Sequence, residues 1–196
     1  ENDLAQQRLE ELTKRSNELS IIGKVFDYER NKLAEIRQAG DALIHACDPE
    51  TMNKEIFGYL GEHSIRTAKK IDAPLLAQRI NNSFSGFCIA LRCDPQYADG
   101  NNTLTASALY LSNKARKYLD TLLDVLERAD QKDEDTENSK SSIREALEQA
   151  ITLFNIQYWQ MISEKTKRID TIIYENKSLD EIKEMCSFLK EGEKPK

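Results

Sequence analysis

The first 46 residues of the chain contain no proline, and their only glycines are Gly23 and Gly40. A run this long without helix breakers predicts one continuous helix from about residue 2 to residue 46. At 1.5 Å per residue, such a helix would span roughly 65–70 Å, which exceeds the diameter of a compact domain made from a chain of this length. Part of the helix is therefore expected to lie outside a single core.

Apolar residues recur at every seventh position along this helix. This row, which we call the a row, consists of Ala5, Leu12, Leu19, Phe26 and Leu33. The companion d row is half charged, with Arg8, Arg15 and Glu29 beside Ile22, Ile36 and Leu43. A two-stranded coiled coil requires both rows to be apolar. The pattern predicts an exposed helical extension over residues 1–25, acting as a stalk or assembly segment, then a helical bundle over 26–190 and a disordered tail over 191–196.

Proline-containing breaks separate the next two helices. Asp48 and Pro49 form a start signal, because aspartate accepts hydrogen bonds from the first free amides and proline suits the first helical position. This signal predicts a second helix that runs to about residue 70. The break at Asp72-Ala73-Pro74 predicts a third helix over about residues 75–92.

Apolar residues then step by three and four from Leu104 to Ala129, which predicts a fourth helix. The acidic segment over residues 130–140 is expected to be a mobile connection. Ser142 with Glu145, and Ser178 with Glu181, match the capping-box pattern of a helix start. These boxes predict a fifth helix that ends near residue 176 and a short last helix.

The composition agrees with helices throughout. Glycine occurs 7 times and proline 4 times in 196 residues, which is too few for a turn-rich β protein. The predicted fold is therefore all-α: an elongated antiparallel helical bundle of five to six helices, with long first and fifth helices.

The chemistry that the sequence offers is sparse. A net charge of −6 argues against a nucleic-acid partner, because phosphate binding needs a basic face. The chain lacks P-loop and dinucleotide-binding glycine patterns, and its two histidines and four cysteines do not have metal-site spacing. We therefore expect no enzyme activity, no cofactor and no metal. No stretch approaches the roughly 20 apolar residues of a membrane span, although a membrane anchor outside these residues stays open.

The cysteines lie near predicted helix ends. If consecutive helices run antiparallel and the second helix returns along the first, Cys47 and Cys93 end at the same pole. The pairs Cys47–Cys93 and Cys88–Cys186 could then form disulfides, and the alternative is four free thiols. Disulfides would favour a secreted, periplasmic or membrane-anchored extracytoplasmic location, which the sequence otherwise leaves open.

Partner contacts are expected on apolar and aromatic residues of the long helices. The candidates are Ala5, Leu12, Leu19, Tyr158 and Trp159. Tyrosine and tryptophan are common in binding hot spots, although such a pair also often divides between core and surface. The sequence predicts a non-catalytic helical interaction or scaffold protein that binds a protein partner, or itself, through the N-terminal helix. Two alternatives stay open: an extracytoplasmic ligand-sensing bundle, and an enzyme with an unmarked carboxylate site.

Overall fold

The computed structural model is helical in every element that it describes. It describes residues 2–57, 73–94, 97, 102–127, 134–174, 178 and 181–182. Within these ranges the elements are α1 (Asn2–Ala46), α2 (Pro49–Phe57), α3 (Ala73–Arg92), α4 (Thr103–Glu127) and α5 (Glu134–Tyr174). The predicted all-α bundle is confirmed, with a first helix of 45 residues and a fifth of 41.

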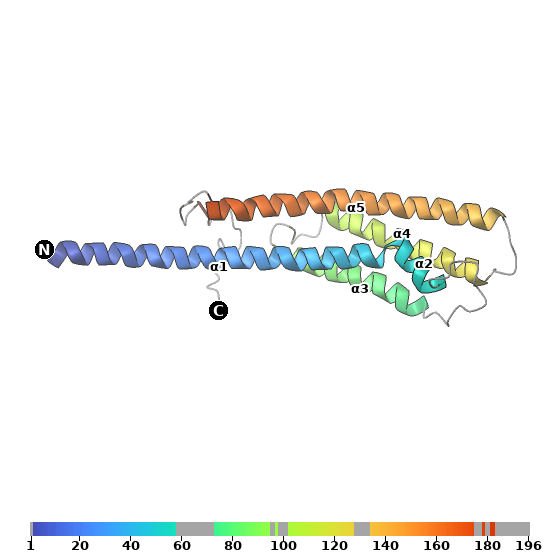
Figure 1. Ribbon diagram of the computed structural model, residues 1–196, viewed down its shortest axis with the longest axis horizontal. Helices are drawn as coiled ribbons and strands as arrows, with labels where there is room; N and C mark the ends of the chain where they lie inside the picture. The colour runs from blue at the N-terminus through green and yellow to red at the C-terminus, as the bar shows by residue number, and fades with distance from the viewer. Residues whose placement is uncertain are drawn as a thin grey trace.

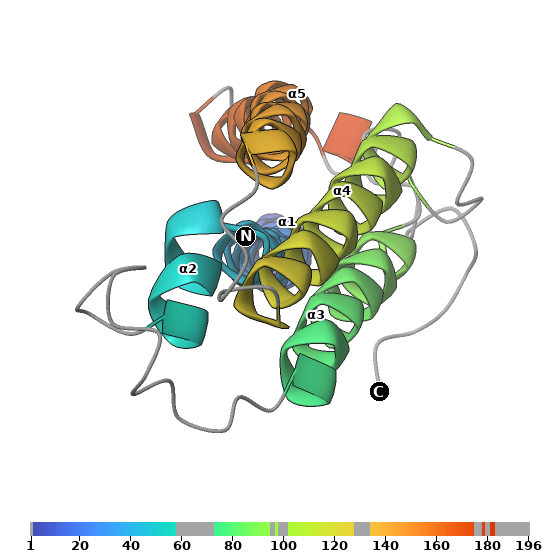
Figure 2. The same ribbon diagram turned by 90° about the vertical axis from the view of Figure 1, so that its right-hand side faces the viewer.

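The four longer helices form an antiparallel bundle (Figure 1). Helix α1 packs against α3 and α5, and α4 packs against the same two helices, so all four surround a common core. Successive long helices run in opposite directions, as short connections favour. The short helix α2 lies beside this group and packs against α4 and α5 at the end where α1 stops (Figure 2).

The core is built from the apolar stripes of α3, α4 and α5, together with buried residues of α1 and α2 such as Ile36, Leu43 and Ile56. The stripe predicted on α4 is buried at each of Leu104, Ala108, Leu111, Ala115, Tyr118 and Leu122. An aromatic group fills the space between α3 and α5. The ring centroid of Phe154 lies 5.2 Å from that of Phe87 and 5.6 Å from that of Tyr158. Edge-to-face and offset ring pairs at these distances are favourable.

Polar caps define several helix starts. The Asp48 carboxylate accepts hydrogen bonds from the backbone amide and the hydroxyl of Thr51, both at 2.7 Å, so the predicted start signal of α2 is confirmed. The Asn102 side chain accepts a hydrogen bond from the Thr105 amide at the start of α4. The described part of α2 ends at Phe57, and the predicted continuation to residue 70 lies outside the described residues.

The start of α5 differs from the prediction. The helix begins at Glu134, so most of the expected connection over residues 130–140 is helical and Ser142 lies inside the helix instead of capping it. Contacts with α2 explain the difference. The Lys140 ammonium lies 5.7 Å from the Phe57 ring centroid, and the Arg144 guanidinium donates a 2.5 Å hydrogen bond to Glu50. These contacts stabilise turns whose own sequence is only weakly helical.

Candidate interaction surface

The a row of α1 changes from exposed to buried along its length. Leu12 and Leu19 are 64% and 68% exposed, Phe26 is half-buried, and Leu33 is 8% exposed. Ala5 is exposed as well. The expected difference in burial between the two halves of the helix is therefore confirmed. Residues 4–24, which we call the arm, are mostly exposed, and the first buried residue of α1 is Val25.

The arm exposes more apolar surface than the a row alone. Leu4 and Leu9 are each more than half exposed. At 3.6 residues per turn, Leu9, Leu12 and Leu19 fall within roughly 80° of one another around the helix axis. A single exposed leucine is ordinary on a protein surface, but these three form a strip along one side of the helix.

Charged residues border this strip. Arg8 and Arg15 occupy d positions, and Glu11 and Glu18 each stand immediately before a leucine of the a row. Arg15 lies 3.7 Å from Glu11 of the same helix, and both side chains are largely exposed. An exposed pair of this kind contributes little to stability, so its charges can reorganise toward another molecule at little cost.

The arm continues from the bundle without a break. At its base, Val25 packs with Ile172 of α5 and with Ile182 in a small second core cluster. The turn that carries Ile182 is held by the predicted capping box, in which the Ser178 amide and hydroxyl donate to the Glu181 carboxylate at 2.7 and 2.9 Å. Beyond this cluster the arm projects past the end of α5 (Figure 1).

The neighbours Tyr158 and Trp159 divide between core and surface. Trp159 is 51% exposed, whereas Tyr158 is fully buried. The Tyr158 hydroxyl donates to the Arg37 carbonyl at 3.0 Å and lies 3.2 Å from the Asp41 carboxylate. Burial, and then the nearby Asp41 carboxylate, raises the pKa of Tyr158. The prediction that Tyr158 contacts a partner is therefore wrong, because its ring and hydroxyl serve the α1–α5 interface, and Trp159 stays a candidate.

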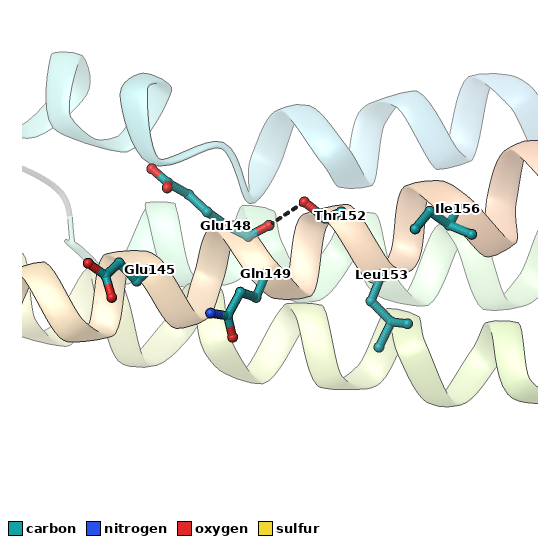
Figure 3. A pocket seen from close by; sticks show the side chains of 6 residues that line it. All are labelled: Glu145, Glu148, Gln149, Thr152, Leu153 and Ile156. Atoms are coloured by element: carbon teal, nitrogen blue, oxygen red, sulfur yellow. Dashed lines mark hydrogen bonds between the residues drawn. The ribbon is translucent and has the colours of Figure 1, made fainter.

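A shallow hollow lies on the outer face of α5, one turn before Trp159. The described residues that line it are Glu145, Glu148, Gln149, Thr152, Leu153 and Ile156 (Figure 3). Leu153 and Ile156 are exposed, and the Thr152 hydroxyl donates to the Glu148 carbonyl. A small-molecule site usually has polar groups that converge from several elements. These six residues all come from one helix, so they form an open surface with apolar character.

A buried ion pair joins the end of α3 to α5. The Asp94 carboxylate contacts the Lys165 ammonium, and both side chains are 7% exposed. The ammonium also lies 5.5 Å from the centroid of the Tyr97 ring. Burial, and then the charge of Asp94, raises the pKa of Tyr97. Sequence reasoning missed this pair, because residues so far apart along the chain give no local signal of their contact.

The predicted Cys47–Cys93 disulfide is contradicted. The helix that returns along α1 is α3. Its end therefore lies beside the middle of α1, where Cys93 is close enough to interact electrostatically with Tyr28 and Lys32. Position 32 is roughly 20 Å from Cys47 along α1, whereas a disulfide needs Cα atoms within about 7 Å. Cys47, Cys88 and Cys93 carry free thiols. Cys186, the predicted partner of Cys88, lies outside the described residues, as do the predicted last helix beyond Ile182 and the tail over 191–196.

Among the described residues, no three histidine, cysteine, aspartate or glutamate side chains gather where they could hold a metal ion. Within those residues, no helix combines the length and apolar character needed to cross a membrane. No protein-family model, curated protein or solved structure matches the chain.

Proposed function

We propose that the protein is a helical interaction protein that docks onto a protein partner, or onto a second copy of itself, through its arm. The observation that supports this most directly is the a row of α1. Its leucine at position 33 packs in the core, and its leucines at positions 12 and 19 stand in solvent at the same heptad positions. A seam that packs helices together in the bundle thus continues into a segment where it is exposed.

Burial of the exposed leucines of the arm would favour docking over a purely solvated helix. Burying one leucine side chain contributes about 1.5–3 kcal/mol, so the arm offers several kcal/mol to a partner that covers its strip. The arm is also an extension of an anchored helix, which lowers the conformational entropy lost on binding. An amphipathic helix with anchors at this spacing is a common means of protein recognition.

Face-specific crosslinking tests the proposal. A photoreactive amino acid is placed at Leu12 or Leu19 on the strip, and at Lys14 or Asn17 on the opposite side of the helix. Crosslinking is done in cells that make the protein. We expect the two strip positions to give an adduct of one defined mass and the two control positions to give none.

A second variant checks that the adduct depends on apolar contact. Leu19→Glu should abolish the adduct from position 12 while circular dichroism shows an unchanged fold, because Leu19 is exposed. Adducts that are equal from both sides of the helix, or absent from all four positions, would contradict the proposal.

A further inference from the structure

We infer that the arm pairs with the arm of a second copy of this chain, in antiparallel orientation. The inference rests on the proposed docking function and adds the identity and the direction of the partner. Two observations support it: the order of the charges along the arm, and the position of Val25, where the arm meets the bundle.

Parallel pairing is unfavourable for this arm. In a parallel two-stranded coiled coil, each d residue packs against the same residue of the partner helix. Arg8 would then face Arg8 of the second copy, and Arg15 would face Arg15 of the second copy. Like charges held together in a seam oppose association.

Antiparallel pairing removes this conflict, because a positions then face d positions. With a two-fold axis between Thr13 and Lys14, Leu12 faces Arg15 of the second copy and Leu19 faces Arg8 of the second copy. Each leucine covers the apolar stem of an arginine. The glutamates complete the arrangement. Glu11 and Glu18 stand beside these leucines, so each carboxylate comes next to the guanidinium of the facing arginine. The contact between Arg15 and Glu11 within one helix indicates that the side chains can reach such a distance.

The length of the arm fits the same register. The axis at Thr13 and Lys14 places Ala5 opposite Ile22 of the second copy, and the N-terminus of each arm beside the base of the other. The overlap is roughly 35 Å long and stops where the cluster around Val25 begins. The two bundles therefore lie at opposite ends of the paired arms. The small side chain at position 5 meets the half-buried Ile22, and the most exposed leucines meet the arginines.

Sedimentation velocity of the purified full-length chain tests self-association. We expect a monomer–dimer equilibrium over about 10–200 µM, since a single seam of this length lies at the lower end of stable interface sizes. Leu12→Glu with Leu19→Glu should weaken dimerisation by about tenfold or more. The matched control, Thr13→Glu with Asn17→Glu, places two glutamates on the outer face and should leave the dissociation constant unchanged. Arg15→Glu should also weaken the dimer, and Arg15→Glu combined with Glu11→Arg should restore it.

Crosslink mapping tests the orientation. A photoreactive residue at position 19 should attach to the segment around Arg8 of the second copy, and attachment around position 19 would overturn the antiparallel arrangement. A purified chain that stays monomeric, together with adducts of another protein in cells, would overturn self-pairing and leave the proposed docking function standing. Absence of adducts in both settings would overturn both.

Discussion

Gly40 of α1 lies directly against the ring of Tyr158 on α5. A Cβ atom at position 40 would stand 2.6 Å from the ring Cζ and 2.9 Å from the hydroxyl oxygen. The absence of a side chain therefore lets the two helices approach closely enough for the Tyr158 hydroxyl to reach the Arg37 carbonyl. This contact fixes the relative position of the two longest helices.

Gly40→Ala should destabilise the protein by about 1–3 kcal/mol, because the Tyr158 ring or one of the helices must move. Gly23→Ala is the matched control, since a Cβ there meets nothing within 4 Å. That substitution should stabilise the helix by about 0.5–1 kcal/mol. Urea unfolding followed by circular dichroism measures both changes. A stabilising effect at position 40 would contradict the packing role of this glycine.

The buried Tyr158 should make the fold sensitive to alkali. Burial, and then Asp41, raises its pKa above the ordinary value of about 10. The folded chain keeps the proton at pH values where the unfolded chain has released it. The contribution to stability is therefore complete below about pH 10 and is lost as the pH rises through the folded pKa. In Tyr158→Phe, the free energy of unfolding should be lower by about 0.5–1.5 kcal/mol near neutral pH, because the hydroxyl contacts are lost.

The pH series distinguishes the ionisation of Tyr158 from a simple loss of packing. Above pH 10, the free energy of unfolding of Tyr158→Phe should decline less steeply than that of the unmodified chain. The decline should not vanish, because burial also raises the pKa values of Tyr28, Tyr97 and Tyr118. Parallel curves for the two proteins would exclude an ionisation effect at position 158.

The free thiols should react with an aromatic disulfide reagent at very different rates. Cys93 is exposed, whereas Cys47 is fully buried and its burial raises its pKa to about 12. Because the thiolate is the reacting species, Cys93 should be modified first and Cys47 only when the protein unfolds. Timed labelling with peptide mass spectrometry measures the order. Fast labelling of Cys47 under native conditions would mean that the corner between α1 and α2 opens readily.

Substitutions of Asp94 and Lys165 should have strongly non-additive effects on the free energy of unfolding, because the two side chains form a buried ion pair. Lys165→Met leaves the Asp94 carboxylate buried without its ammonium partner, and we expect a loss of about 3–5 kcal/mol. Asp94→Asn combined with Lys165→Met should recover much of that loss, because the buried charge is then gone. A double-mutant cycle by chemical unfolding measures the coupling. Additive effects of the two single changes would rule out a direct interaction.

The features that were predicted correctly depend on short-range signals. Helix α1 ends where Asp48 and Pro49 start the next helix, and the cap of α2 joins Asp48 to Thr51, only three positions further along the chain. The exposed arm could be predicted because Arg8 and Arg15 interrupt the d row within the arm itself. The role of Tyr158 could have been predicted too, since it stands four residues after the buried Phe154 on the same helical stripe.

The features that were missed depend on contacts between distant segments. Helix α5 begins early because Lys140 and Arg144 contact residues of α2, and no pattern near Glu134 indicates those neighbours. The location of Cys93 depended on which helix returns along α1. The sequence pattern favoured the second helix, whereas α3 occupies that position.

The unbroken course of α1 has a consequence for anything that binds the arm. Because α1 is one continuous helix from Asn2 to Ala46, the position of each residue along its axis and the direction of each side chain around it are fixed relative to the bundle. Leu12 lies roughly 42 Å from Gly40 along the axis, and its direction around that axis is set by the fit of Gly40 against Tyr158. A partner that binds the arm is therefore held at a fixed distance from the bundle and in a fixed orientation around the axis of α1.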